Sequence, residues 1–200
     1  MNFRIEESLW RKGFQFIAGV DEAGRGPLAG PIVAAAVILL PNAKLPKLND
    51  SKLLSEHRRE ILYKQILDQA FAVGIAEVSH KMIDRLSIGK ANALVMEKAI
   101  KALEIPPDYL LIDGKHGLPN LNIQQKAIVG GDGKSPSIAA ASIIAKVTRD
   151  RIMLKYHLKH PHYGFADHKG YGTREHFEML EEHGPCEIHR RSFFPLTQMC

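Results

Sequence analysis

Four acidic side chains stand where a predicted strand ends or a predicted helix is about to begin. Asp21 and Glu22 precede a turn rich in glycine, Asp113 ends a short apolar strand, and Asp132 lies in the loop GGDGK ahead of a long helix. We therefore expect the four carboxylates to meet at one rim of one sheet. Crowded carboxylates repel one another, and oxygen ligands suit Mg²⁺ or Mn²⁺. Two such ions could hold the attacking and leaving oxygens during phosphodiester hydrolysis.

Each of these acidic residues also has a more ordinary interpretation. A single aspartate at a strand end is more often a turn-former than a catalytic group. Asp150 lies within a predicted helix beside Arg149 and Arg151, with Lys146 at the i−4 position. We interpret it as part of a structural ion pair, with a salt bridge to Asp150 as the expected use of Arg149. Asp132, between two glycines, is therefore the better fourth ligand.

Other motifs with recognised chemistry are absent or weak. The run GRGPLAG over 24–30 does not match G-x-G-x-x-G, and it lacks the lysine and hydroxyl of a P-loop, which excludes dinucleotide and P-loop sites. His183, Cys186 and His189 have suggestive spacing, but three ligands in a loop are weak evidence for zinc. Three further late histidines, His160, His162 and His168, are expected to contact phosphates or to pack locally.

The elements that must position these residues follow from hydrophobic periodicity and from glycine and proline. Ser135 is expected to cap the long helix, with Pro136 in its first turn, and the small residues over 137–145 allow close packing on a sheet. A hairpin-like pair followed by alternating helices and strands predicts an α/β fold, a mixed sheet with flanking helices. The predicted strands are 14–21, 32–40, 71–78, 109–113 and 121–129, and the predicted helices are 56–69, 90–104, 136–160 and 173–182.

Length and composition exclude several classes of protein. A chain of 200 residues with 45% hydrophobic residues is expected to form one domain with a small helical appendage. Two cysteines cannot make a disulfide framework. The first residues are too charged for a secretory signal, and the longest apolar run, 32–40, is too short to span a bilayer. We therefore expect a cytoplasmic protein without a membrane partner.

The basic residues are not evenly spread along the chain. The formal net charge is +5, yet the stretch 114–160 alone carries eight Lys or Arg against two acidic residues. Such segregation is expected of a side that faces a polyanion. On this evidence alone, a solvated helix face explains it equally well.

Five short motifs follow one another across nearly the whole chain: GVDEAGRGPLAGP (19–31), DSK (50–52), IDG (112–114), SIAAASIIAKVTRD (137–150) and HKGYGT (168–173). One motif alone would be weak evidence, but together, and in this order, they resemble the ribonuclease HII family. The resemblance implies an RNase H-like core over 1–160 and a small C-terminal helical extension over 161–200 that completes the substrate groove.

The resemblance also implies an activity and its metal ions. The family cleaves the RNA strand of RNA–DNA hybrids and cuts on the 5′ side of single ribonucleotides in duplex DNA, leaving 3′-hydroxyl and 5′-phosphate ends. By position, the catalytic and metal-binding carboxylates fall on Asp21, Glu22, Asp113 and Asp132. The expected cofactor is Mg²⁺ or Mn²⁺ in a two-metal site. Such a nucleic acid is the expected partner of a monomeric enzyme, and contact with a sliding clamp is left open.

Substrate contacts carry over from the same motifs. Gly24, Arg25 and Gly26 match the loop that resembles the family's reader of the ribose 2′-hydroxyl, where glycine permits a close approach of the backbone. Tyr171 matches the tyrosine that packs on the sugar beside the RNA–DNA junction, although it could simply anchor its loop. The candidate phosphate contacts are Lys52 and Lys146.

Two rival functions belong to other classes. Another RNase H-like nuclease, such as a junction resolvase or an integrase, would share the carboxylates but not the GRG loop and Tyr171. A non-catalytic nucleic-acid-binding module would bind without metal-dependent turnover. Replacing the target ribonucleotide by its deoxy analogue separates the first rival from the favoured function, and assaying turnover separates the second.

Overall fold

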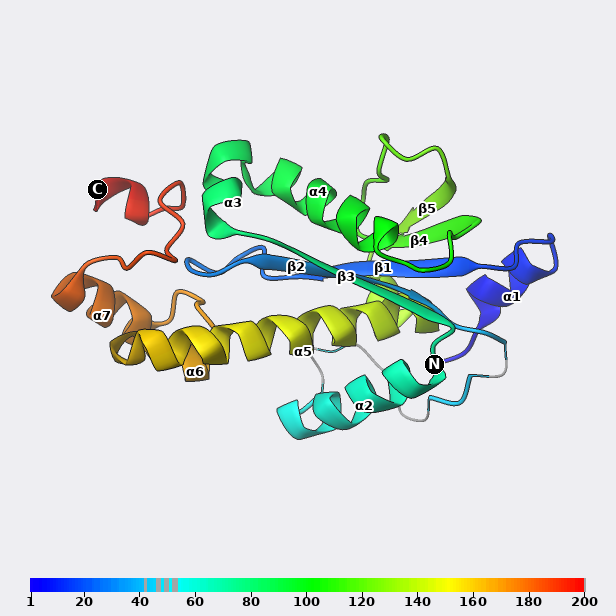
Figure 1. The fold of residues 1–200 in the computed structure, drawn as a ribbon, viewed down its shortest axis with the longest axis horizontal. Coiled ribbons are helices and arrows are strands. Elements are labelled where there is room, and N and C mark those ends of the chain that lie inside the picture. The colour runs from blue at the N-terminus through cyan, green and yellow to red at the C-terminus, as the bar shows by residue number, and fades with distance from the viewer. Residues whose placement is uncertain (42, 46–47, 49–50, 52–53, 200) are drawn as a thin grey trace.

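A five-stranded sheet forms the centre of the computed structural model, which describes residues 1–41, 43–45, 48, 51 and 54–199 (Figure 1). The strand order is β3-β2-β1-β4-β5, with β1 antiparallel to β2, β2 antiparallel to β3, and β1, β4 and β5 parallel. This confirms the mixed sheet and the hairpin-like pair predicted from the sequence. The strands are β1 Ile17–Ala23, β2 Ile32–Ile38, β3 Ala72–Val78, β4 Tyr109–Asp113 and β5 Gln124–Ile128.

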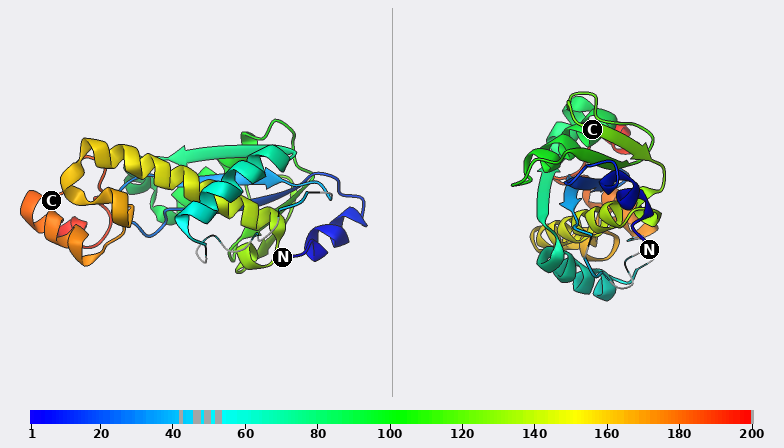
Figure 2. Two further views of the ribbon diagram at one scale, coloured as in Figure 1. Left: turned by 90° about the horizontal axis from the view of Figure 1, so that it is seen from below. Right: turned by 90° about the vertical axis from the view of Figure 1, so that its right-hand side faces the viewer.

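Helices cover both faces of the sheet. In Figures 1 and 2, α3 and α4 lie on one face and α2 and α5 on the other, while α6 and α7 lie at one end of the molecule. The sequence predicted α2, α4, α5 and α7 and missed the short helices α1, α3 and α6. The helices are α1 Arg4–Trp10, α2 Glu56–Gln69, α3 His80–Leu86, α4 Ile88–Lys101, α5 Pro136–Lys159, α6 Phe165–His168 and α7 Arg174–His183, with 3₁₀ turns η2 Gly131–Gly133, η3 Pro161–Tyr163 and η4 Leu196–Gln198.

The long helix α5 packs its backbone directly on the central strand. A Cβ atom added at Gly19 of β1 would overlap the backbone of Ser137 and Ile138. The small side chains of the first turns of α5, which are fully buried, allow this approach. As predicted, Ser135 caps the helix, its hydroxyl accepting from the backbone N–H of Ile138 at 3.3 Å.

Helix α1 supplies a second, distant cap to α5. The buried carboxylate of Glu6 accepts a hydrogen bond from the Ser135 hydroxyl at 2.6 Å and from the Ser137 backbone N–H at 3.1 Å. The first N–H groups of a helix have no partner inside the helix, and they favour negative charge. The N-terminal helix therefore fixes the start of α5.

Two hydrophobic layers separate the sheet from its helices. Alternation along β2 sends Ala34, Ala36 and Ile38 toward α4, and Ala35 and Val37 toward α5. Every residue of β2 is buried because both faces are covered. The α4 side also contains Val20, Val95, Ala99 and Leu110, and the α5 side contains Leu62, Ile66, Ile143 and Ile144.

The C-terminal segment returns to the loop that joins β1 and β2. His189 forms a β-bridge with Ala29, and the backbone N–H of Arg190 donates to Leu28 O at 2.8 Å. The Leu28 N–H in turn donates to Gly170 O at 2.8 Å. Buried Phe165 and neighbouring apolar residues fill the space between these segments. Among the described residues, no helix has the length and apolar character needed to cross a membrane.

The close approach at Gly19 makes it the most sensitive glycine to test. Gly19→Ala should lower the free energy of unfolding by about 3 kcal/mol or more, because neither backbone can move away without opening the core. Gly89→Ala in α4 is the matched control, since nothing lies within 4 Å of the added methyl group. It should be neutral or stabilising by up to ~1 kcal/mol. Urea unfolding measures both, and equal effects would contradict the packing described.

Candidate active site

The parallel pairing of β1 and β4 brings the first carboxylates together. Val20 of β1 lies opposite Ile112 of β4, so Asp21 and Asp113 follow side by side where the parallel pairing of these two strands ends. Contrary to the sequence interpretation, β1 does not end at Asp21 but continues to Ala23, pairing with β2. Asp21 and Glu22 nevertheless line one cleft, although they are neighbours in a strand.

A cleft of about 230 Å³ opens at this rim of the sheet. It joins three of the predicted carboxylates to the predicted sugar-reading loop and the predicted tyrosine. The described residues that line it are Asp21, Glu22, Ala23, Gly24, Arg25, Gly26, Ser51, Asp113, Ser142, Lys146 and Tyr171.

Burial and mutual repulsion disfavour the ionised forms of two carboxylates in this cleft, Asp21 and Glu22. Burial, followed by repulsion from Glu22 and Asp113, raises the pKa of Asp21 well above its usual value. Burial also raises the pKa of Glu22, against the opposing effect of Arg25, whose Nη1 lies 3.3 Å from Glu22 Oε1. Asp21 is 4% exposed and accepts the Glu22 backbone N–H at 2.8 Å. Positive charge in the cleft would relieve this strain.

Asp132 lies next to this group but not in the lining of the cleft. It is buried in η2, between the two glycines that the sequence indicated. The backbone N–H of the preceding Gly131 donates to Asp113 Oδ1 at 2.7 Å, which ties η2 to the end of β4. Within the described ranges, no three His, Cys, Asp or Glu side chains already form a set that could hold a metal ion.

Two buried arginines hold the loop after β1. The Arg190 guanidinium donates to the carbonyls of Gly24 at 2.7 Å, Arg25 at 3.0 Å, Gly30 at 3.0 Å and Pro31 at 3.2 Å. Burial lowers the pKa of Arg190 to about 9. Gly24 has φ +100°, a conformation that glycine adopts readily, and a Cβ there would overlap the Arg149 side chain. The loop is therefore held by side chains from outside it.

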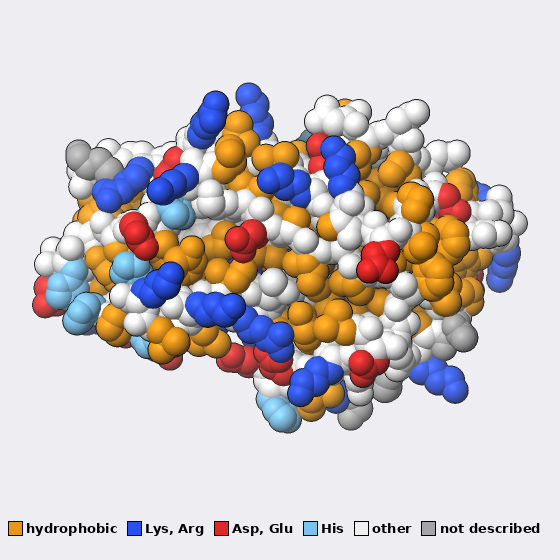
Figure 3. Space-filling view, viewed as in Figure 1, with side chains coloured by type: hydrophobic (Ala, Val, Ile, Leu, Met, Phe, Trp, Pro, Cys, Tyr) orange, Lys and Arg blue, Asp and Glu red, His pale blue; other side chains and the backbone are white. Residues whose placement is uncertain are grey.

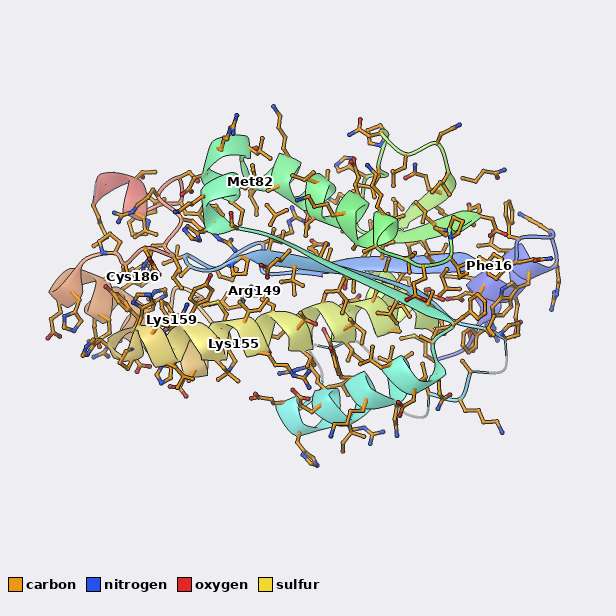
Figure 4. The ribbon with its side chains drawn as sticks, in the orientation of Figure 1. Phe16, Met82, Arg149, Lys155, Lys159 and Cys186 are labelled. Atoms are coloured by element: carbon orange, nitrogen blue, oxygen red, sulfur yellow. The ribbon has the colours of Figure 1, made fainter. Side chains whose placement is uncertain are left out.

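The predicted salt bridge between Arg149 and Asp150 is wrong. Arg149 is fully buried and donates instead to the carbonyls of Pro31 at 3.0 Å, Lys169 at 3.0 Å and Ala29 at 3.1 Å. Neighbours in a helix point in different directions, so Arg149 and Asp150 cannot share one face. Figure 4 shows Arg149 between α5 and the sheet.

The structural ion pair expected at Asp150 is confirmed, with Lys146 at the i−4 position as its partner and Arg59 as an additional one. Lys146 Nζ lies 2.7 Å from Asp150 Oδ1, and Arg59 Nη2 lies 3.9 Å from Oδ2. Burial lowers the pKa of Lys146, and its side chain also lines the cleft. Arg151 pairs with Glu60 at 2.6 Å.

The basic stretch 114–160 consequently does not act as one charged face. Part of its charge is used internally, by Lys146, Arg149 and Arg151. Lys155 and Lys159 project outward from the far end of α5 (Figure 4), and Figure 3 shows basic side chains interspersed with acidic ones on that side of the molecule.

Tyr171 stands opposite the carboxylates in the lining of the cleft. Its side chain is 44% exposed, and Arg149 Cζ lies 5.9 Å from the centre of its ring. A Cβ added at Gly26 would come within 3.7 Å of Tyr171 Cε1. The ring therefore lies beside the GRG loop, where the sequence motifs predicted both elements of sugar recognition.

Asp50 and Lys52 of the DSK motif lie outside the described residues. Other residues of the site were not predicted from the sequence. Ser51 of the same motif lines the cleft, and its hydroxyl lies 2.9 Å from that of Ser142, which faces Asp21 from α5. Both serines sit inside quoted motifs, whereas Arg190 in the run EIHRRSFF carries no periodic or spacing signal.

The late histidines pack within the C-terminal segment. His189 is buried and bonds to the backbone of Cys186 and to another histidine, while the ring of His183 lies 5.1 Å from that of His162. His183, Cys186 and His189 are not a metal-ligand set among the described residues. His168 packs locally, as one of its two interpretations predicted, with its ring stacked 4.5 Å from that of His176.

Comparison with known proteins agrees with the motifs. A family model described as Ribonuclease HII matches residues 18–195. Ribonuclease HII of Geobacter metallireducens is 54% identical over 195 residues, covering 94% of this chain and 91% of that protein. The crystal structure of ribonuclease H2 from Pyrococcus horikoshii OT3 superposes with a TM-score of 0.78 at 29% identity, over 92% of this chain and 96% of that one.

A more distant neighbour shares the fold alone. It is Bst-RNase HIII in complex with Mn²⁺, with a TM-score of 0.68 at 19% identity, over 92% of this chain and 69% of that one. Because the family model spans most of the sequence and the Geobacter relative is 54% identical, this chain belongs to the ribonuclease HII family and is an endoribonuclease, as its ordered motifs predicted.

Proposed function

We propose that the cleft hydrolyses the RNA strand of RNA–DNA hybrids and the bond 5′ to a single ribonucleotide in duplex DNA, leaving 3′-hydroxyl and 5′-phosphate ends. One observation carries this proposal. The carboxylates of Asp21, Glu22 and Asp113 share a small cleft with the GRG loop and Tyr171. Acidic groups suited to phosphodiester chemistry thus face elements suited to reading a sugar.

The residues of the cleft fit the divalent metal on which this family depends. The donor set consists of oxygens, and burial together with mutual repulsion raises the pKa of Asp21 and Glu22, so a cation would stabilise their ionised forms. Asp21, Glu22, Asp113 and Asp132 would hold Mg²⁺ or Mn²⁺ in a two-metal site. The chemistry that such a site supplies is activation of water for in-line attack and stabilisation of the departing 3′-oxygen.

The loop over 24–26 would read the ribose 2′-hydroxyl through its backbone. Arg190 takes the carbonyls of Gly24 and Arg25, so we expect the N–H groups of the loop to meet the sugar. A hydroxyl accepts from such donors, and a deoxyribose offers no oxygen there. A loop held by buried side chains keeps these donors in place before the substrate arrives.

The remaining contacts would hold the nucleic acid on either side of the cut. Tyr171 would pack on the sugar beside the RNA–DNA junction, and Lys146, with Lys52 outside the described residues, would approach phosphates. Residues 161–200 would complete the groove, because Tyr171 and Arg190 both come from this segment and both reach the loop after β1.

One cleavage assay tests this function. The substrate is a DNA duplex with a single embedded ribonucleotide, assayed with Mg²⁺, with Mn²⁺ or with chelator. We expect one cut on the 5′ side of the ribonucleotide with either metal and none with chelator. The matched duplex with the deoxy analogue should resist cleavage. Cleavage of that all-DNA duplex would instead support a nuclease of another RNase H-like type.

Asp113→Asn should abolish cleavage while leaving the fold intact. The substitution removes a negative charge from the cleft, but the amide oxygen can still accept the Gly131 N–H. We expect a loss of at least about 10³-fold in kcat with saturating Mg²⁺. Asp108→Asn at the opposite end of β4 is the control: it loses one of the two backbone N–H groups that Asp108 accepts but leaves the cleft untouched, so it should retain cleavage. Near wild-type cleavage by Asp113→Asn would refute the proposed role of this carboxylate.

Asp21→Asn should raise the thermal stability of the metal-free protein while removing activity. The folded-state pKa of Asp21 is raised, so its contribution to stability is present at low pH and is lost as the pH rises through that pKa. At neutral pH the neutral amide avoids this loss. Melting temperatures in chelator should therefore be higher for Asp21→Asn than for the wild type, and Mn²⁺ should stabilise only the wild type markedly. A lower melting temperature for the variant in chelator would contradict the strain described.

A further inference from the structure

A buried pair of histidines lies behind Tyr171 and has no part in the chemistry described so far. His176 in α7 and His189 in the C-terminal segment are 0% and 1% exposed, and their Nε2 atoms lie 3.0 Å apart. His176 Nδ1 lies 2.9 Å from the carbonyl oxygen of Tyr171, and His189 Nδ1 lies 2.9 Å from the backbone N of Cys186. Figure 3 shows histidines gathered at this end of the molecule.

These contacts form a hydrogen-bond chain from Cys186 N through His189 and His176 to Tyr171 O. The groups at its two ends fix the direction of every hydrogen bond in it. The Cys186 N–H can only donate, so His189 Nδ1 accepts and its hydrogen is on Nε2. His189 Nε2 then donates to His176 Nε2, which leaves the His176 hydrogen on Nδ1. That hydrogen is donated to the Tyr171 carbonyl, which can only accept.

The alternative tautomers place like atoms against each other. His189 Nδ1 also lies 3.3 Å from Cys186 O and could donate there, but its Nε2 would then be an acceptor facing His176. His176 would then have to donate from a hydrogen on Nε2. Its Nδ1, without a hydrogen, would face the Tyr171 carbonyl oxygen at 2.9 Å, which places two acceptors against each other. One neutral arrangement therefore satisfies the three contacts of 2.9 to 3.0 Å.

Both rings are held neutral by their surroundings. Burial is the main cause that lowers the pKa of His176 to about 4 and that of His189 to about 3. A second proton on either ring would put two donors against each other at the 3.0 Å contact. The hydrogen-bond chain therefore keeps the same donors and acceptors at neutral pH.

The same short segment reaches both elements of sugar recognition. His189 acts on Tyr171 through His176, and the next residue, Arg190, donates to the carbonyls of Gly24 and Arg25. The Tyr171 carbonyl also accepts the Thr173 N–H at 2.9 Å, so His176 adds a second contact to the turn that carries the ring, and His189 links this turn to the C-terminal segment. The ring is thereby placed relative to the loop by one rigid segment.

We propose that His176 and His189 are positioning residues that hold the Tyr171 turn through a directional hydrogen-bond chain and so set the selectivity of the cleft for a ribonucleotide followed by DNA. The proposal rests on the function proposed above, because it takes Tyr171 as the group beside the RNA–DNA junction. It predicts that loss of the chain affects junction substrates more than uniform RNA–DNA hybrids, where no deoxyribose follows the cut.

The direction of the chain can be tested on the wild-type protein without any activity measurement. Nitrogen-15 NMR of labelled histidines at neutral pH distinguishes a ring protonated on Nδ1 from one protonated on Nε2. We expect the Nδ1–H form for His176 and the Nε2–H form for His189, both neutral. The opposite tautomer at either residue, or a charged ring, would overturn the chain.

The effect on selectivity is tested by a double-mutant cycle with Tyr171. His176→Phe keeps a ring but removes both nitrogens, and it should lower kcat/KM on the single-ribonucleotide duplex about tenfold, with a smaller effect on a long hybrid. In a Tyr171→Ala background the same change should cost less than about twofold, because the group being positioned is gone. His176→Asn, whose amide N–H can replace the Nδ1–H, should recover much of the loss.

Controls separate positioning from general damage. His183→Gln alters another histidine of the same helix and should leave both substrates unaffected. The Mn²⁺ concentration for half-maximal activity should be the same in all variants, because the carboxylates are untouched. Additive effects of His176→Phe and Tyr171→Ala would overturn the inference. Wild-type activity and selectivity of Tyr171→Ala alone would overturn the proposed role of Tyr171 and the selectivity claim with it. The NMR measurement of the histidine tautomers would still test the hydrogen-bond chain separately.

Discussion

The contact between two buried guanidinium groups and the carbonyls of the loop after β1 joins the three parts of this molecule. Arg149 comes from α5, Arg190 from the C-terminal segment, and both donate to carbonyls within residues 24–31. Burying cations is costly unless every donor finds an acceptor, and a glycine-rich loop leaves many carbonyls needing donors. The guanidinium donors and the loop carbonyls therefore satisfy one another's hydrogen bonds. The loop keeps a conformation that its own residues would not maintain.

The arginine contacts stabilise the loop after β1, whereas the carboxylates in the other part of the cleft destabilise one another. Asp21 and Glu22 are placed where burial and repulsion raise the pKa of both, so the sheet maintains an arrangement that is unfavourable by itself. Only strong packing tolerates such crowding, and β1 has it, since β2 and β4 pair on both sides and α5 lies against Gly19. The stability lost at this rim is what the proposed divalent cation would restore by neutralising the carboxylates.

Sequence reasoning predicted the parts of the protein that depend on local pattern. The strands, the capped start of α5 and the meeting of Asp21 with Asp113 follow from alternation and from strand ends. The role of Arg149 was misread because adjacency in sequence suggested a partner that helical geometry does not allow. Arg190 gave no signal, since Gly24 lies 166 residues away in the chain. His176 and His189 gave none either, because no periodic pattern pairs a residue of α7 with one in the loop that follows it. Lys52 lies outside the described residues.

The proposed reading of a sugar by backbone atoms would account for these distant contacts. A glycine loop can approach a ribose closely but is flexible by itself, so its rigidity must come from elsewhere. Here it comes from Arg190, which lies 166 residues from Gly24. The carboxylates depend on strand pairing, whereas the GRG loop and Tyr171 depend on the C-terminal segment. Damage to that segment should therefore weaken recognition of the ribonucleotide before it disturbs the carboxylates.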